Sequence, residues 1–213
     1  MLNDKKEPFC ASECNLYDKY EFRGIRADEA EQAAQIEQVC FPPNEACKPE
    51  IMRERVKIFP ETFLVAVSRE TGKVVGFING IATDEPHLRD DFYTDAALHE
   101  PNGSNVMILG VDVLPEYRKQ GIAREMMRSY LCREKDKGRK MVVLTCLDDK
   151  VRMYKTFGFR DDGEADSSWG GEKWHEMCCA LDISPTSGEP KKGRIHYRFS
   201  PIPASSFILS KVK

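Results

Sequence analysis

The sequence predicts an α/β fold in which a mixed β-sheet carries helices on both faces. Apolar strand-like runs alternate with amphipathic helical patterns from about residue 21 to residue 182. A strand, helix and second strand over residues 106–146 require a crossover, which places two parallel strands side by side. Residues 62–68 and 74–81 are β-type runs separated by Arg-Glu-Thr-Gly, which favours an antiparallel hairpin. Parallel and antiparallel pairs in one chain predict a mixed sheet.

The N-terminal part of this region predicts one strand and two helices. Residues 21–26 have the pattern of a first strand, and Asp28, with an acid three residues later, is positioned to cap the helix that follows. A second helix is predicted between the prolines at positions 49 and 60, because proline suits a first helical turn and also ends a helix. The first helix turns a small and apolar stripe toward the core: Ala33, Ile36 and Cys40.

The C-terminal part predicts a central strand followed by alternating helices and strands. Residues 83–103 interrupt the pattern with acids and prolines, so a loop is expected there. Asp148 or Asp149 can cap a short helix that ends at Gly158. The other expected elements are a strand at 106–113, a helix at about 122–135 ended by Gly138, a strand at 141–146 and last strands near Phe159 and at 174–181.

Composition and charge divide the 213 residues into three parts. Residues 1–20 are predicted to be a polar arm, residues 21–182 a single domain and residues 183–213 a basic extension. The extension holds six Lys and Arg and one acid, although the whole chain has a formal net charge of −3. Proline and apolar residues interrupt this basic segment, so docking on the acidic body or on a neighbouring subunit is as consistent with it as nucleic-acid binding.

No targeting or membrane-spanning pattern stands out, so a cytoplasmic location is expected. Free thiols fit that reducing compartment, and several of the cysteines lie inside expected helices or strands. Cys10 and Cys14 have the spacing of half a metal site, but no second half follows, so no metal is expected. The cysteines are Cys10, Cys14, Cys40, Cys47, Cys132, Cys146, Cys178 and Cys179.

Residues 111–123 have the pattern of a strand, a short basic turn and the start of a helix. Backbone N–H groups at a helix N-terminus are unpaired and point toward an approaching anion. Gly121 lets the backbone curl closely around such a group, and Ala123 adds little bulk. The pattern lacks the Gly-Lys-Ser/Thr of a Walker A loop and the three glycines of a dinucleotide fingerprint. An ordinary turn with solvated basic side chains remains the alternative.

The spacing Arg-x-x-Gly-x-Ala after a Val-x-Val strand resembles the acetyl-CoA pyrophosphate turn of the GNAT superfamily of N-acetyltransferases. Met153 to Phe159 resembles the Tyr-x-x-Phe-Gly-Phe segment of many members, and Cys40 to Glu45 and residues 84–103 are similar to the arylalkylamine N-acetyltransferase branch. The resemblance implies a GNAT-like sheet of about seven strands. It also implies acetyl-CoA as cosubstrate, bound by Val111, Asp112, Val113, Arg118, Lys119, Gln120, Gly121, Ile122, Ala123 and Arg124.

The resemblance implies a general acid, and the sequence leaves the base less certain. Tyr154 matches the catalytic tyrosine that protonates the departing thiolate; a buried tyrosine packing the short helix is the alternative. The two histidines of vertebrate serotonin-acetylating members are replaced by Met107 and Leu109, which accept no proton. Glu45 is the first candidate base, against the alternative of a solvated loop carboxylate. Weaker candidates are Asp112, His87 and His99.

The loop at residues 83–103 is either a hydrophilic surface excursion or a substrate lid. Its negative field would attract a cationic amine, and Phe92 and Tyr93 could stack on an aromatic acceptor or simply anchor the loop. Its acids are Asp84, Glu85, Asp90, Asp91, Asp95 and Glu100.

These observations predict acetyl-CoA-dependent transfer of an acetyl group to a small primary amine of the arylalkylamine kind, by direct attack on the thioester. A polyamine or a peptide amine is a second acceptor class, and a non-catalytic acyl-CoA-binding module is an alternative of another kind. The expected partners are the amine and acetyl-CoA, with neither nucleic acid nor membrane, and a homodimer is left open.

Overall fold

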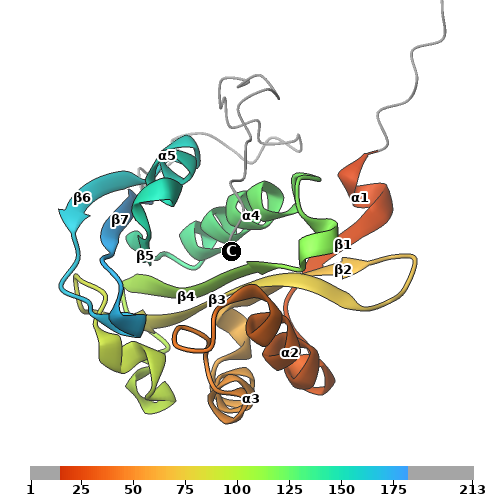
Figure 1. The fold of residues 1–213 in the computed structure, drawn as a ribbon, viewed down its shortest axis with the longest axis horizontal. Coiled ribbons are helices and arrows are strands. Elements are labelled where there is room, and N and C mark those ends of the chain that lie inside the picture. The colour runs from red at the N-terminus through yellow and green to blue at the C-terminus, as the bar shows by residue number, and fades with distance from the viewer. Residues whose placement is uncertain (1–14, 182–213) are drawn as a thin grey trace, which may run out of the picture.

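The computed structural model describes residues 15–181, which form one seven-stranded sheet in the order β1-β2-β3-β4-β5-β7-β6 (Figure 1). All neighbouring strands are antiparallel except β4 and β5, which are parallel. The predicted mixed sheet is therefore confirmed. Its strands are β1 (Tyr20–Arg23), β2 (Phe63–Ser68), β3 (Val74–Thr83), β4 (Asn105–Val113), β5 (Met141–Cys146), β6 (Arg160–Glu164) and β7 (His175–Ala180).

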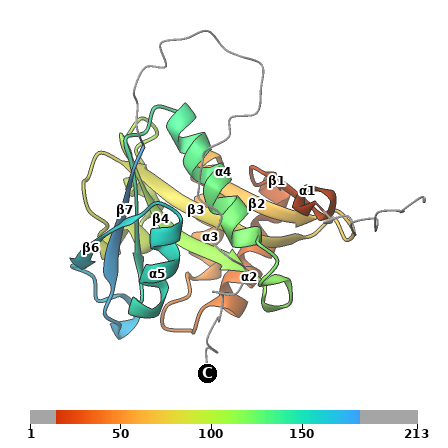
Figure 2. The ribbon, with the colours of Figure 1, turned by 90° about the horizontal axis from the view of Figure 1, so that it is seen from above.

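Helices cover both faces of the sheet, as predicted. The second and third helices lie on one face, and the fourth and fifth lie on the other, with α4 crossing over the central strands (Figures 1 and 2). Each face has its own buried core, and the central strands contribute side chains to both. The helices are α1 (Leu16–Lys19), α2 (Ala30–Cys40), α3 (Pro49–Ile58), α4 (Ile122–Asp136) and α5 (Asp148–Thr156).

The structure corrects three local predictions. Asp28 does not cap α2: a 3₁₀ turn over Ala27–Glu29 precedes this helix, and the Glu29 carboxylate accepts the Arg26 N–H at 2.8 Å. A bidentate pair with Arg23 fixes Glu29 in that role. Neither Asp148 nor Asp149 is the cap of α5, because both lie inside its first turn, where an acid still favours the helix dipole. Residues 15–20, assigned to the arm, include α1 and the first residue of β1.

A bulge in β4 divides the strand into two halves that face different neighbours. Asn79 and Gly80 of β3 pair with Gly110 and Ile108, which leaves Leu109 as an extra residue. Before the bulge β4 pairs with β5, ending at Met107 opposite Val143. After it the described chain has no β4–β5 pairing, while β5 continues to pair with β7. Bulges commonly end pairing next to functional sites, and here β4 and β5 separate beyond this point.

Candidate active site

The separation of β4 and β5 opens the sheet beside residues 110–113. Val111 is partly exposed, whereas Asp112 and Val113 are buried. The side chains of Val111 and Val113 pack with the α4-face core, so both predicted residues serve the core while their backbone borders the gap. An unpaired strand edge offers N–H and C=O groups to an extended ligand.

The turn between β4 and α4 is held in shape by its own side chains. Lys119 and Gly121 both have positive φ, at 63° and 91°. Arg118 donates from Nε to the Val113 carbonyl at 2.8 Å, and Gln120 accepts from the Tyr20 hydroxyl at 2.7 Å. The side chains of Arg118 and Gln120 therefore tie the turn to β4 and β1. Their predicted part in acetyl-CoA binding stays a prediction, and with these side chains engaged it would fall mainly to the backbone of the turn.

The start of α4 has the properties of an anion site. The first helical backbone bond runs from the Glu125 N–H to the Gly121 carbonyl. The N–H groups of Ile122 and Ala123 come before it, in the first turn, where a helix leaves such groups unpaired. A Cβ at Gly121 would meet nothing within 4 Å, so the space in front of the turn is open. Ile122 anchors the helix in the core, and Lys119 and Arg124 are exposed beside it. This arrangement fits the phosphates of the cosubstrate that the sequence predicts.

Tyr154 lies in the core of the α4 face, close to the region where the strands separate. Its ring makes edge contacts with Phe157 at 6.1 Å and Phe159 at 5.8 Å. Burial raises the pKa of Tyr154, and Cys146 and Asp112, which lie within electrostatic range of its hydroxyl, raise it further. The hydroxyl therefore stays protonated at physiological pH, which a proton donor requires.

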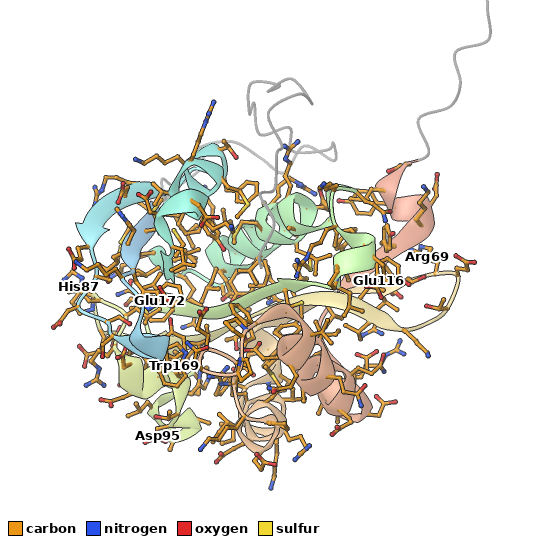
Figure 3. The ribbon with its side chains drawn as sticks, in the orientation of Figure 1. Arg69, His87, Asp95, Glu116, Trp169 and Glu172 are labelled. Carbon is orange, nitrogen blue, oxygen red and sulfur yellow. The ribbon has the colours of Figure 1, made fainter. Side chains whose placement is uncertain are left out.

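Glu45 lies where the loop after α2 meets the connection between β6 and β7. Trp169, in the connection between β6 and β7, donates from Nε1 to the Glu45 carbonyl at 2.9 Å, and Asn44 donates to the Gly170 carbonyl at 2.7 Å. Partial burial, then repulsion from Glu172, raises the pKa of the Glu45 carboxyl. In Figure 3 Trp169 and Glu172 lie near each other, away from Glu116. Glu116 belongs to the turn between β4 and α4, which we call the phosphate turn after the ligand predicted for it.

The acidic loop is anchored to the body at several points. Its 3₁₀ turns, Asp90–Tyr93 and Ala96–Leu98, fold it against the α2 face. Phe92 is buried there beneath Arg89, so it is an anchor and is not available to stack on an acceptor. Tyr93 stacks on Trp169 at 4.7 Å and shares a 2.9 Å hydrogen bond with Thr145. Asp84, Asp90, Asp95 and Glu100 accept hydrogen bonds from nearby chain.

The two histidine candidates lie in other contacts. His99 is buried between the Ala82 N–H and Glu61, and burial lowers its pKa. His87 is largely exposed and contacts Glu176 at 2.7 Å, which raises its pKa. Figure 3 shows His87 at the outer edge, far from the phosphate turn. These contacts hold both histidines away from the place where β4 and β5 separate.

The structure places a buried carboxyl pair beside β4 that sequence analysis missed in part. Glu37 of α2 and Asp112 of β4 are both almost completely buried, and burial together with their mutual repulsion raises the pKa of Asp112. Burial also raises the pKa of Glu37. The signal for Glu37 was present, because it lies on the same helical stripe as Ala33 and Cys40.

Features outside this site concern metal binding, the membrane and the cysteines. Among residues 15–181, Asp162, Glu176 and Cys178 are one group close enough to hold a metal ion, but Arg160 and His87 already contact its carboxylates. No described helix is both long and apolar enough to span a bilayer. Six described cysteines are free, whereas Cys10, Cys14 and the basic extension lie outside the described residues.

Comparison with known proteins gives a consistent match. The model of the acetyltransferase (GNAT) family matches residues 30–159. An uncharacterized N-acetyltransferase, YkwB, of Bacillus subtilis is 25% identical over 118 residues, covering 50% of this chain and 51% of that protein. Human N-acetyltransferase 8 is 29% identical over 106 residues, covering 48% and 40%. The chain thus matches about half or less of the length of these relatives.

Solved structures share the fold at low sequence identity. The loading GNATL domain of CurA from Lyngbya majuscula has a TM-score of 0.66 at 17% identity, covering 76% of this chain and 98% of that chain. A phosphinothricin acetyltransferase of Sinorhizobium meliloti, solved with acetyl-CoA, has a TM-score of 0.59 at 16% identity, covering 82% and 95%. At such identities the likeness establishes the fold alone.

Proposed function

The chain belongs to the acetyltransferase (GNAT) family, and on this premise we propose that it transfers an acetyl group from acetyl-CoA to a small primary amine. The observation that carries the proposal is the separation of β4 and β5 after Met107, continued by the glycine turn and the start of α4. A strand edge for an extended arm and a helix N-terminus for phosphates lie in sequence along one path.

In the proposed reaction the amine nitrogen attacks the thioester carbonyl directly. A carbon–nitrogen bond forms and the carbon–sulfur bond breaks, so the nitrogen must lose protons and the sulfur must gain one. Backbone N–H groups of residues 111–113 are proposed to stabilise the negative carbonyl oxygen of the tetrahedral intermediate. Tyr154 is proposed to protonate the thiolate, because burial keeps its hydroxyl protonated.

Glu45 is proposed as the base that first receives the ammonium proton. Its raised pKa, caused by partial burial and by Glu172, supports a carboxylate more basic than a solvated one. A primary ammonium has a pKa near 10, so the binding site must lower that value or pass the proton onward. The position of Glu45 between the two loops, beside Trp169, supports a role where the acceptor amine binds.

An arylalkylamine is the proposed acceptor class. The resemblance of Cys40 to Glu45 and of the acidic loop to that branch supports it. So does the partly exposed stack of Tyr93 and Trp169 beside Glu45, which offers an aromatic surface next to a carboxylate. A polyamine or a peptide amine is the second candidate, supported by the acids of the loop at residues 84–100.

An amine panel tests this function. Purified protein is incubated with acetyl-CoA and tryptamine, spermidine or a lysine-containing peptide, and free thiol is followed over time. We expect thiol release with tryptamine above the rate without amine, and mass spectrometry should find N-acetyltryptamine. A preference for spermidine or the peptide would move the acceptor to the second class. Binding of CoA with no turnover on any of the three would instead indicate an acyl-CoA-binding module.

A further inference from the structure

Three polar side chains from different elements converge over Gly110, on the α2 face of β4. A Cβ built on Gly110 would lie 2.9 Å from Asn79 Oδ1, 3.1 Å from Asp112 Oδ2 and 3.4 Å from Glu37 Oε2. These three side chains are 0%, 1% and 3% exposed. Buried polar atoms are normally hydrogen-bonded, so a group without partners needs an explanation.

The converging atoms make no well-formed hydrogen bond within residues 15–181. They include both Asp112 oxygens, Glu37 Oε2 and both amide atoms of Asn79. Glu37 Oε1, in contrast, accepts the Cys47 N–H at 2.9 Å, which fixes the orientation of that carboxyl. The structure thus points two carboxyls and one amide at one another, with no cationic side chain bonded to them among the described residues.

Charge balance determines how many protons the two carboxyls carry. Cys40 on α2 and Cys47 on the following loop have thiol pKa values raised by burial to about 12 and about 11, so both are neutral. Arg55 of α3 is fully buried, donates to the Tyr93 carbonyl at 2.8 Å and lies within electrostatic range of Glu37. One arginine compensates one carboxylate, and Arg118, at the turn, is half-buried and bonded to β4. Two charged carboxylates so close together would repel strongly, so one retains its proton.

The pair also lies next to the proposed chemistry. Asp112 is between Val111 and Val113, whose backbone borders the separated strands, and its charge contributes to the raised pKa of Tyr154. Gly110, directly before Val111, has no side chain to close the space where the polar atoms meet. A proton released near β4 therefore has a buried acceptor within the same strand.

We propose that Glu37 and Asp112 hold one shared proton and that their ionised member accepts a second proton from the acceptor amine, with Asp112, on the half of β4 beyond its described pairing with β5, as the member that receives it. The proposal rests on the proposed acetyl transfer. Glu45 takes the first ammonium proton, and the carboxyl pair takes the proton that nitrogen loses as the carbon–nitrogen bond forms. Tyr154 gives its proton to the thiolate. Solvent removes the protons from Glu45 and the pair and restores that of Tyr154, so one proton is released in each cycle.

The kinetic test compares Asp112→Asn, Glu37→Gln and Glu54→Gln. The control residue, Glu54, is an exposed acid on α3, and its variant undergoes the same chemical change. For tryptamine we expect kcat/KM to fall about 100-fold in Asp112→Asn, the scale of a lost proton-transfer group, and to lose its rise with pH. Glu37→Gln should shift that rise to another pH, and Glu54→Gln should match the wild type. The acetyl-CoA dissociation constant should be unchanged in all three, because residues 111–113 are proposed to contact the cosubstrate through their backbone, which Asp112→Asn retains.

A folded Asp112→Asn protein with the wild-type pH profile would overturn the proposed proton transfer. Glu45→Gln, measured in parallel, separates the role of Glu45 from that of the carboxyl pair. This variant should lose rate but keep the pH dependence that comes from Glu37 and Asp112. If Glu45→Gln alone abolished all pH dependence, the carboxyl pair would have no part in proton transfer.

Stability against pH tests the shared proton without any turnover. A carboxyl whose pKa is raised on folding binds more protons folded than unfolded, so wild-type stability falls as pH rises above the unfolded pKa of about 4. Asp112→Asn lacks this loss, so its free energy of unfolding relative to wild type should increase between pH 4 and neutrality, measured by urea denaturation. Equal pH slopes for wild type, Asp112→Asn and Glu37→Gln would disprove the shared proton. If the wild type acetylates no amine, the proposed function fails while this measurement still decides the protonation of the pair.

Discussion

At the scale of the residue, two tyrosine hydroxyls of the α4-face core differ in whether a neighbouring group accepts a hydrogen bond from them. The Tyr130 hydroxyl donates to the Thr62 carbonyl at 3.1 Å in the core between α4 and the sheet. Tyr154 is nearly as buried and is held only by ring contacts in the described contacts. The Tyr154 hydroxyl, which has no hydrogen-bond partner among the described contacts, is therefore the one available to a substrate.

This contrast gives a matched pair of substitutions. We expect Tyr154→Phe to lower kcat for amine acetylation by about 100-fold, because it removes the proposed proton donor and leaves the ring in place. Its acetyl-CoA affinity, measured by calorimetry, should stay near that of the wild type. Tyr130→Phe should lose about 1 kcal/mol of stability, the scale of one hydrogen bond, and keep its kcat. Equal kcat values for both variants would remove Tyr154 from the chemistry.

At the scale of the element, β4 and α4 together form the proposed acetyl-CoA site. The bulge at Leu109 ends the pairing of β4 with β5, and the turn after Val113 then brings the start of α4 to the end of the opened strand. Gly121 has a φ of 91°, which favours glycine because a Cβ would strain the backbone there. Gly138, just after α4, has a φ of 80° and equally open space around it.

These two glycines allow stability and binding to be separated. Gly121→Ala and Gly138→Ala should each cost about 1 kcal/mol of stability, since both force a Cβ into a left-handed conformation. Only Gly121→Ala should weaken acetyl-CoA binding, because relief of its strain moves the N–H groups at the start of α4. Each 1.4 kcal/mol, approximately, of lost binding free energy would raise the acetyl-CoA dissociation constant about tenfold. Equal acetyl-CoA affinities in the two variants would place the phosphates elsewhere.

At the scale of the whole molecule, the sheet and its two helical layers form one body that contains every part of the proposed site. The phosphate turn, the separated strands and the loops around Trp169 all lie within residues 15–181 (Figure 3). We therefore propose residues 21–182, extended at the start by α1, as the catalytic unit. The basic extension at 183–213 is proposed to be an addition to it.

Ligand-dependent melting checks this division. At about 100 times its dissociation constant, acetyl-CoA should stabilise the full chain by about 2.7 kcal/mol, because it binds the folded state alone. A chain ending at residue 182 should melt cooperatively and gain the same increment. A truncated chain that folds but gains no stability from acetyl-CoA would assign the extension to the site.

Much of this architecture followed from local patterns. Helix α3 and the β2–β3 hairpin were predicted within about two residues, because proline positions and alternating apolar runs are local signals. The glycine turn before α4 was predicted in the same way. The starts of α2 and α5 were also predicted within about two residues, but their capping residues were wrong, because several neighbouring side chains could supply the capping group.

The sequence by itself determined the order of the strands and helices, the glycine turn and the resemblance that led to the family, since all of these are written in neighbouring residues. Only the tertiary structure placed Glu37 against Asp112, buried Phe92 and brought Trp169 to Glu45. Contacts between distant segments depend on how faces pack and on a one-residue bulge that redirects a strand. The pKa of a carboxyl follows from burial and from the charges beside it, and both exist only once the chain is folded.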